Sequence, residues 1–192
     1  TGFVWIKRKI TTTQSEQIKE LQSENLIPGI TLREELGRRY PNDMIASHLI
    51  GYVGIDNTGL EGIEWSLENE LAPVSDSSEN AIFGNQVFLT IDVNIQFAME
   101  KIAATAFEEN QAESVMLLIM EAKTGNILAY VSIPHYDPNN YSDYDWSSLL
   151  NRPIRTAYEP GSVFKIFSLA SFMQLGGITK NDTFLCNGYF ED

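Results

Sequence analysis

The sequence predicts an α+β fold, and three patterns lead to this prediction. Apolar residues recur at helical spacing between residues 95 and 107, as in a helix that packs on a flat surface. Two apolar runs, residues 115–120 and 127–133, flank a short polar stretch and indicate the strands of an antiparallel hairpin. Residues 163–175 are apolar on almost every side, which is typical of a buried helix.

The first part of the chain predicts helices separated by short extended runs. Charged residues alternate with apolar ones in a helical rhythm over residues 14–26, and Pro28-Gly29 ends this pattern. Short β-like runs follow at residues 31–32 and 49–55. Apolar residues at helical spacing then predict an amphipathic helix over residues 60–71.

A composition change suggests where two domains meet. Residues 72–80 are rich in Ser, Asp and Pro, and they predict a linker or exposed loop. We therefore predict one domain at residues 1–75 and a second at residues 76–192. Beyond the linker, residues 87–91 are a strand candidate, and Asp92 is placed to cap the helix that follows.

The segment between the hairpin and the last helix, residues 134–155, is predicted to be a long loop. Asp, Asn, Tyr and Trp are frequent in it. A loop of this length is often a functional rim or a mobile segment, and an ordinary connection explains the same composition. These interpretations stay open.

The composition predicts a folded chain that does not bind nucleic acid. The 192 residues are 43% hydrophobic and 20% charged, which is enough to bury a core. The net charge of −13 argues against nucleic acid or anionic lipid as a partner, because both select basic surfaces. The basic cluster Lys7-Arg8-Lys9 is either a phosphate-binding patch or the solvated end of a strand or helix.

Cysteine and histidine give no sign of a metal or cofactor. Cys186 is the only cysteine, so an internal disulfide is impossible. His48 and His135 are far apart in sequence and lack flanking ligands, so we predict structural histidines, no metal site and no cofactor. No apolar run approaches the roughly 18 residues of a membrane span, and the chain does not begin with a signal-peptide pattern.

The strongest chemical signal is a serine followed one helical turn later by a lysine. Pro160-Gly161 predicts a tight entry to the last helix, and Ser162 falls near its start. Lys165 shares a face with Ser162, because residues i and i+3 do so on a helix.

This pair predicts acyl transfer through a serine ester. A serine hydroxyl needs a base, and an amine kept neutral by burial can take its proton. The helix N-terminus favours the negative charge that develops on an attacked carbonyl oxygen. A serine that caps a core helix beside a solvated lysine fits the same residues.

The serine motif resembles that of the penicillin-binding proteins and serine β-lactamases, and the resemblance continues through most of the chain. The stretches that carry it are Tyr158 to Lys165; Phe88-Leu89-Thr90-Ile91-Asp92, Ile95-Gln96 and Glu100; Thr124 to Ala129, Ser132-Ile133-Pro134 and Tyr136 to Asn139; and Arg39-Tyr40-Pro41, residues 46–54 and residues 59–64. Together they are similar to a class B penicillin-binding protein. The resemblance implies part of a pedestal (dimerisation-type) domain followed by the N-terminal part of a β-lactamase-like transpeptidase domain.

The resemblance also implies a function, that of a peptidoglycan D,D-transpeptidase in bacterial cell-wall synthesis. Ser162 would be acylated by stem peptides that end in D-Ala-D-Ala, and by β-lactam antibiotics, with Lys165 as the base. Residues 59–64 look like the septal, division type, and the pedestal would bind cell-division proteins. The family implies an anchor ahead of Thr1 in the bacterial cytoplasmic membrane, with the catalytic domain on the outer side.

Several features depart from the family pattern. Val163 and Tyr130 stand where the family often has threonine and methionine. No Ser-x-Asn or Lys-Thr-Gly motif follows Ser162, so we expect the 192-residue chain alone to be inactive, with the apolar surface of its last helix exposed or covered by a partner chain. Lys123-Thr124-Gly125 spells the third motif, but it precedes the serine and is predicted to be a hairpin turn.

Two other functions remain as alternatives. A non-catalytic division scaffold would use the pedestal to bind its partners. A serine β-lactamase or β-lactam sensor would share Ser162 and Lys165, but the pedestal-like residues 30–71 disfavour it.

Overall fold

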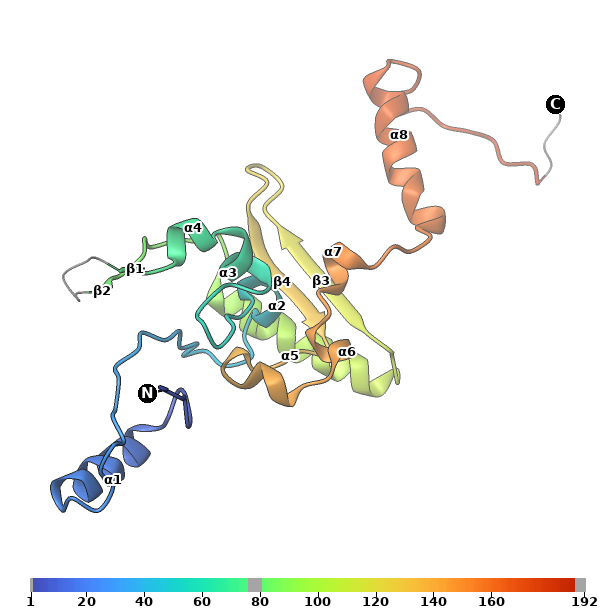
Figure 1. The fold of residues 1–192 in the computed structure, drawn as a ribbon. Helices are drawn as coiled ribbons and strands as arrows, with labels where there is room; N and C mark the ends of the chain where they lie inside the picture. The colour runs from blue at the N-terminus through green and yellow to red at the C-terminus, as the bar shows by residue number, and fades with distance from the viewer. Residues whose placement is uncertain (1, 76–80, 189–192) are drawn as a thin grey trace. The chain divides into compact units, whose positions relative to one another are not determined.

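The computed structural model describes residues 2–75 and 81–188. The chain divides into two units, residues 1–155 and 156–192, and each unit is described by itself (Figure 1). The first unit contains a helix on a β-hairpin together with several short helices. The second contains one longer helix with a short 3-10 turn before it.

The centre of the first unit is the hairpin with helix α5 on one face (Figure 1). Strands β3 (Val115–Met120) and β4 (Ile127–Ile133) pair antiparallel, with Val115 opposite Ile133. Helix α5 (Val93–Glu109) lies across them. The small apolar core consists of Ala103, Val131 and Ile133 with Met99, Phe107, Val115 and Leu117 packed around them. The predicted helix, hairpin and α+β class are confirmed.

Helix α5 begins where the sequence predicts. The Asp92 side chain accepts hydrogen bonds from the main-chain N–H groups of Asn94 (2.9 Å) and Ile95 (3.1 Å). A cap of this kind stabilises a helix by about 1 kcal/mol. The predicted apolar face is only partly correct, because Ile102 is 55% exposed, whereas Gln96 and Glu100 are buried.

The strand predicted at residues 87–91 is wrong. These residues belong to no strand, and Phe88 is 88% exposed. Two bonds tie the end of the segment to β4, from Thr90 Oγ1 to the carbonyl of Ile127 (2.7 Å) and from the Asp92 N–H to the carbonyl of Leu128 (3.0 Å). An apolar run becomes a strand only when a neighbouring strand completes its ladder, and the described residues supply none here.

The predicted first helix is present as α1 (Thr12–Ser23), with a capping box between Thr11 and Gln14. The predicted helix over residues 60–71 divides into α3 (Gly62–Ser66) and α4 (Glu68–Leu71), because Leu67 between them has a non-helical φ of −115°.

The β-like runs predicted in the first part are wrong. Residues 31–32 form no strand, and residues 49–50 end helix α2 (Ser47–Ile50), where the N–H groups of Leu49 and Ile50 both donate to the carbonyl of Ala46. Of residues 49–55, only Val53 makes a β-bridge, to Gly59. At residues 49–50, local helical bonding satisfies the backbone where the composition suggested a strand.

Two glycines let α2 and α3 pack closely. Gly51 has a φ of +81°, and a Cβ atom there would lie 1.7 Å from the carbonyl oxygen of Glu61. Gly62 in turn approaches the main chain of Leu49 and Gly51. Only glycine fits such a contact between two main chains.

The predicted linker lies partly outside the described residues, at positions 76–80. On either side of them, β1 (Val74–Ser75) pairs antiparallel with β2 (Ala81–Ile82). The domain boundary near residue 75 therefore stays a prediction.

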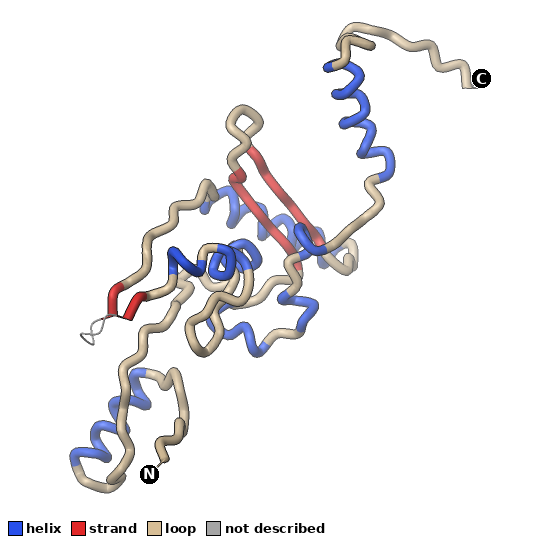
Figure 2. Tube along the Cα trace, turned by 45° about the horizontal axis from the view of Figure 1, so that its top comes forward, coloured by secondary structure: helices blue, strands red, loops and turns tan. Residues whose placement is uncertain are grey.

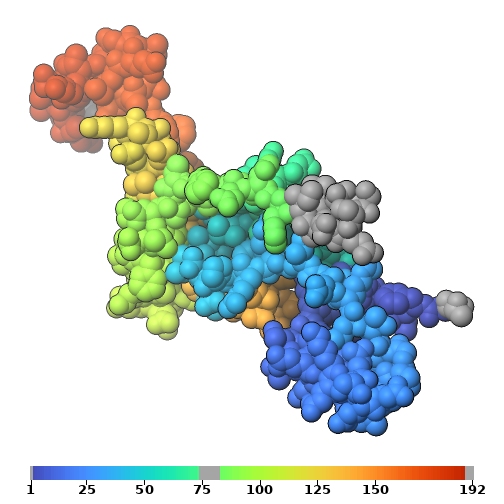
Figure 3. All heavy atoms as spheres, turned by 90° about the vertical axis from the view of Figure 1, so that its left-hand side faces the viewer, coloured from blue at the N-terminus to red at the C-terminus, as the bar shows by residue number. Residues whose placement is uncertain are grey.

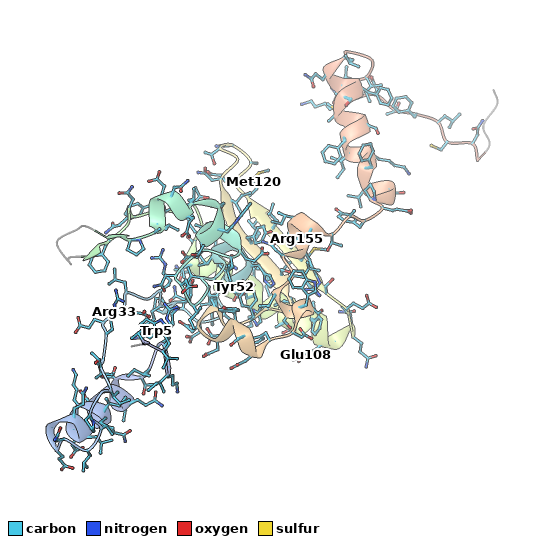
Figure 4. The ribbon with its side chains drawn as sticks, in the orientation of Figure 1. Trp5, Arg33, Tyr52, Glu108, Met120 and Arg155 are labelled. Carbon is cyan, nitrogen blue, oxygen red and sulfur yellow. The ribbon has the colours of Figure 1, made fainter. Side chains whose placement is uncertain are left out.

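The predicted long loop at residues 134–155 contains short helical segments (Figure 2). These are η1 (Pro138–Asp143), α6 (Trp146–Leu149) and α7 (Arg152–Arg155). The loop packs through aromatic rings: Tyr136 meets His48 and Tyr52 edge-on, with ring centroids 5.1 and 5.6 Å apart, and Tyr141 stacks on Tyr52 at 4.2 Å. Tyr52 is labelled in Figure 4.

The second unit contains η2 (Gly161–Phe164) and α8 (Lys165–Gln174). A helix was predicted at residues 163–175, and its presence is confirmed. None of its described residues is buried, so the burial that its composition suggests is not found, and the exposed apolar surface predicted for the 192-residue chain alone is confirmed. The exposed apolar side chains on or beside it are Val163, Phe164, Ile166, Phe167, Leu169, Phe172, Met173 and Leu175. This exposure is what we expect of such a helix where the described chain supplies no surface to cover it.

Candidate active site

Ser162 and Lys165 are separated by a single tight turn. Ser162 is the second residue of η2, and Lys165 is the first residue of α8, whose main-chain N–H donates to the carbonyl of Ser162. In a 3-10 turn, side chains at i and i+3 lie one above the other. The structure therefore places the two side chains on one face, as the spacing predicts. Among the described residues, no hydrogen bond joins Ser162 Oγ to Lys165 Nζ.

Ser162 does not cap a helix. Pro160 is the N-cap residue of η2 and Phe164 that of α8, and neither helix start has a capping bond from a side chain. The geometry thus gives the Ser162 hydroxyl no structural role among the described residues. The tight entry is supported by Gly161, whose φ is +53°.

The chemistry that this turn can support is limited by its exposure. Ser162 and Lys165 are both exposed, so the described residues provide the hydroxyl and the amine but not the burial that keeps an amine neutral. The ten residues of α8 run away from the serine, and the positive end of the helix dipole therefore lies close to it. These features suit a nucleophile whose surroundings are completed by other residues.

Lys123 lies in the exposed turn between β3 and β4, as predicted for the Lys-Thr-Gly sequence at residues 123–125. Gly125 in the same turn has a φ of +79°, and the Thr124 hydroxyl donates to the Glu121 carboxylate. The turn is thus stabilised by its own residues, and Lys123 itself forms none of these contacts.

His48 has a structural role within the first unit. His48 is 3% exposed, and its Nε2 lies 2.9 Å from the carbonyl oxygen of Ser148, so this nitrogen carries the proton and donates. Burial lowers the pKa of His48 to about 4 and also lowers the pKa of His135, which the charge of Glu100 partly opposes. In residues 2–75 and 81–188, no group of three His, Cys, Asp or Glu side chains is placed to hold a metal.

The basic cluster Lys7-Arg8-Lys9 is largely engaged by neighbouring residues. Arg8 pairs with Glu35 (3.2 Å) and with Asp56, and Lys9 Nζ donates to the carbonyl of Gly54 (3.1 Å). Two of the three cations therefore bond to the protein itself, which does not favour a phosphate-binding patch.

Sequence reasoning missed a buried polar network between α5 and β4. The Gln96 side chain is fully buried; its Nε2 donates to Glu100 Oε1 (2.7 Å) and to the carbonyl of Tyr130 (2.9 Å), and its Oε1 accepts from the Tyr130 N–H (2.7 Å). Glu100 Oε1 also accepts from the N–H of Ala46 (2.7 Å). The space-filling view shows the segment that contains Ala46, in light blue, against green α5 (Figure 3). The sequence signal for this network was the spacing of Gln96 and Glu100, which are four residues apart and therefore lie on one side of the helix, beside its apolar face.

Comparisons with known proteins place both parts of the chain in one family. The model of the penicillin-binding protein dimerisation domain matches residues 2–85, and that of the penicillin-binding protein transpeptidase domain matches residues 115–191. The two models together cover most of the chain in the order that the sequence predicts.

Curated relatives agree with this assignment. The chain is 31% identical over 203 residues to the probable peptidoglycan D,D-transpeptidase PenA of Neisseria gonorrhoeae, with 94% of this chain and 34% of that protein covered. It is 30% identical over 195 residues to the peptidoglycan D,D-transpeptidase FtsI of Escherichia coli, with 93% and 32% covered. It is 30% identical over 205 residues to the stage V sporulation protein D of Bacillus subtilis, with 96% and 31% covered. The chain thus spans about a third of the length of these relatives.

Solved structures show the same likeness. Penicillin-binding protein 3 of Mycobacterium tuberculosis, in complex with aztreonam, aligns with a TM-score of 0.67 and 29% identity over 76% of this chain and 33% of that one. Penicillin-binding protein 2X of Streptococcus thermophilus aligns with a TM-score of 0.65 and 25% identity over 91% of this chain and 30% of that one.

The fold and the two matched domain models define a protein of the penicillin-binding transpeptidase class. The chain belongs to the class B penicillin-binding proteins and contains parts of the dimerisation domain and the transpeptidase domain. Among the helices that the structure describes, none has both the length and the apolar character that crossing a bilayer requires.

Proposed function

We propose that the protein carrying this chain is a serine-type peptidoglycan D,D-transpeptidase of the cell-division type. The observation that carries the proposal is the Ser162–Lys165 turn at the head of α8, inside the residues that match the transpeptidase domain model. Relatives named as D,D-transpeptidases along nearly the whole chain support the same reaction. The pedestal-like part would serve to bind cell-division proteins, at the outer face of the bacterial cytoplasmic membrane.

The reaction would proceed in two acyl transfers at one oxygen. Ser162 Oγ attacks the carbonyl carbon of the penultimate D-alanine of a stem peptide, and its proton passes to Lys165 Nζ. The C–N bond breaks as the lysine returns the proton to the leaving D-alanine amine. An amine of a neighbouring stem peptide then attacks the ester, forms the new peptide bond and restores the serine hydroxyl.

The same oxygen would react with β-lactams. Attack on the ring carbonyl opens the lactam C–N bond, and the whole antibiotic remains on the serine as an ester, because the leaving amine stays tethered. The penicillin-binding protein 3 structures that resemble this chain include complexes with aztreonam and ampicillin. No cofactor takes part in either reaction as proposed.

The domain boundary belongs to the same proposal. We place it near residue 75, with residues 1–75 in the dimerisation domain and residues 76–192 in the transpeptidase domain. The short β1–β2 pairing on either side of residues 76–80 is the feature of the fold that supports a boundary there.

The test is the intact mass of the protein, extended to the length of its relatives, after incubation with ampicillin. We expect a mass increase of one antibiotic molecule, which Ser162→Ala abolishes and Lys165→Ala strongly slows. Ser168→Ala, on the same helix, is the matched control for the serine, and Lys123→Ala is the control for the lysine; both should label as the wild type does. A folded wild-type protein that gains no mass would favour the non-catalytic division scaffold instead.

A further inference from the structure

Residues 86–91 form a stretch of main chain without partners in the first unit. The loop that joins β2 to α5 contains them, and it has neither helix nor strand from residue 83 to residue 91 (Figure 2). Within residues 2–75 and 81–188, no main-chain hydrogen bond involves the N–H or carbonyl groups of residues 86–91. Since these groups must form hydrogen bonds in a folded protein, solvent or a further partner satisfies them.

The stretch is held at both of its ends. At one end, the Asn85 N–H donates to the carbonyl of Glu70 (2.6 Å), and Asn85 Nδ2 donates to Glu70 Oε2 (2.7 Å). At the other end, Thr90 Oγ1 and the Asp92 N–H both donate to carbonyl groups at the start of β4. Because its ends are fixed, pairing of this stretch with another strand costs little further conformational entropy.

The composition of the stretch is that of a strand without the usual protection of a sheet edge. Residues 87–91 read Val-Phe-Leu-Thr-Ile, which are residue types enriched in strands. Val87 and Ile91 are half-buried, whereas Phe88 is 88% exposed. Exposed strand edges commonly carry charged residues or prolines that block pairing, and residues 86–91 contain neither. The stretch is therefore open to pairing.

An apolar groove of about 350 Å³ lies beside the stretch. Its apolar lining includes Val87, Leu89 and Ile91 of the stretch, with Pro41, Ile45 and Ile50 from the segment around α2. A groove of this size has room for apolar side chains. When a strand adds to a free edge, main-chain hydrogen bonds provide affinity and pockets take its alternate side chains. The stretch and the groove together offer both kinds of contact.

We propose that residues 86–91 receive an added strand, which is an extended apolar segment of the same polypeptide outside these 192 residues. The chain spans about a third of the length of its relatives, so a protein of that length has further chain to supply the segment. A segment tethered to the same polypeptide has an effective concentration on the order of millimolar, which favours it over a separate partner. The main chains pair, and at least one large apolar side chain of the segment fills the groove. This inference does not depend on the proposed acylation of Ser162.

Hydrogen exchange resolved to single amides tests the pairing, in the 192-residue chain and in the protein extended to the length of its relatives. Successive N–H groups of a strand point to opposite edges, so one added strand protects every second amide. We expect the amides of residues 87–91 to exchange freely in the shorter chain. In the longer protein, every second amide should exchange at least about a hundredfold more slowly.

A substitution in the groove tests the side-chain contact. Leu89→Lys places a charge beside the apolar lining and should remove the protection in the longer protein. In the 192-residue chain it should leave the unfolding midpoint unchanged, because Leu89 is 39% exposed there. Phe97→Lys is the matched control and should keep the protection, because Phe97 is an exposed apolar residue of α5 that does not line the groove.

Three results would overturn the proposal. Unprotected amides at residues 87–91 of the longer protein would mean that no strand is added. Equal protection of all these amides would mean burial without pairing. Protection that appears in the 192-residue chain as its concentration rises would mean that the partner is a second copy. If Leu89→Lys does not fold in the longer protein, the exchange pattern of the wild type decides.

Discussion

Helices α5 and α8 differ in composition and burial in opposite senses. Helix α5 buries two polar side chains, Gln96 and Glu100, together with Ala103. Helix α8 is richer in large apolar residues and buries none of them. The available partner surface therefore decides burial. Helix α5 has a hairpin to pack on, and polar groups are tolerated there because hydrogen bonds satisfy them.

The largest effect is expected where two main chains touch in the first unit. Gly51→Ala would place a Cβ atom 1.7 Å from the carbonyl oxygen of Glu61 and would also strain a φ of +81°. We expect a loss of about 4 kcal/mol in the free energy of unfolding, read from hydrogen exchange of the β4 amides. Gly125→Ala, with a φ of +79° and nothing within 4 Å, is the control for strain alone and should cost about 1 kcal/mol. Equal costs at the two positions would contradict the close packing of α2 on α3.

The next effect is a dependence of stability on pH. Burial lowers the pKa of His48 from an ordinary value of 6.5 to about 4, so between these values the unfolded chain binds more protons than the folded one. The stability that the neutral, buried His48 contributes is therefore fully present above pH 6.5. As the pH drops toward 4, the free energy of unfolding falls by about 3 kcal/mol. The groups that face the ring are the Ser148 carbonyl, Tyr136, His135 and Arg152.

Thermal unfolding between pH 4 and 7 measures this dependence. In His48→Gln the stability should be lower at pH 7, because the imidazole packing is lost, but its slope in this pH window should be much flatter. His135→Gln is the matched control, since the pKa of His135 is also lowered by burial but its side chain is less buried. A variant at position 48 that keeps the full slope would assign the titration to another group.

A smaller loss of stability is expected when the buried polar network is disrupted. Gln96→Leu keeps the size of the side chain but leaves the N–H and carbonyl of Tyr130 without a partner at this position. We expect a loss of about 2 kcal/mol, because unsatisfied buried groups keep their desolvation cost. The neighbouring exposed position serves as the control, with Phe97→Leu expected to change stability by no more than about 0.5 kcal/mol. Urea unfolding checks both, and a neutral Gln96→Leu would show that the network adds no stability.

The sequence predicted those parts of the fold whose hydrogen-bond and packing partners are close in sequence. The capped start of α5 at Asp92 and the β3–β4 hairpin are of this kind, since each is completed by residues close in sequence. The Ser162–Lys165 spacing was also readable, because a single turn determines it.

The remaining features depend on contacts that sequence spacing does not encode. Residues 87–91 have the composition of a strand, but their ladder partner is absent from the described chain. The bond between Asn151 and His48 joins positions 103 residues apart, so no local pattern points to it. The family resemblance identified Gln96 and Glu100 as typical of the class, and only the structure shows that they satisfy one another and the Ala46 N–H.

The smallest change in stability is expected from a substitution on α8, the helix that buries none of its apolar residues. Leu169 is exposed, so Leu169→Ser in the 192-residue chain should change its stability by no more than about 0.5 kcal/mol. The same kind of change in the hairpin core, Val131→Ser, should cost about 3 kcal/mol, because that side chain is 2% exposed. Repeating Leu169→Ser in the protein extended to the length of its relatives then asks what covers the helix. A cost close to that of Val131→Ser in the longer protein, with none in the shorter chain, would mean that α8 is a core helix whose packing surface lies outside these 192 residues; a neutral result in both would leave its apolar side chains free to bind a partner chain.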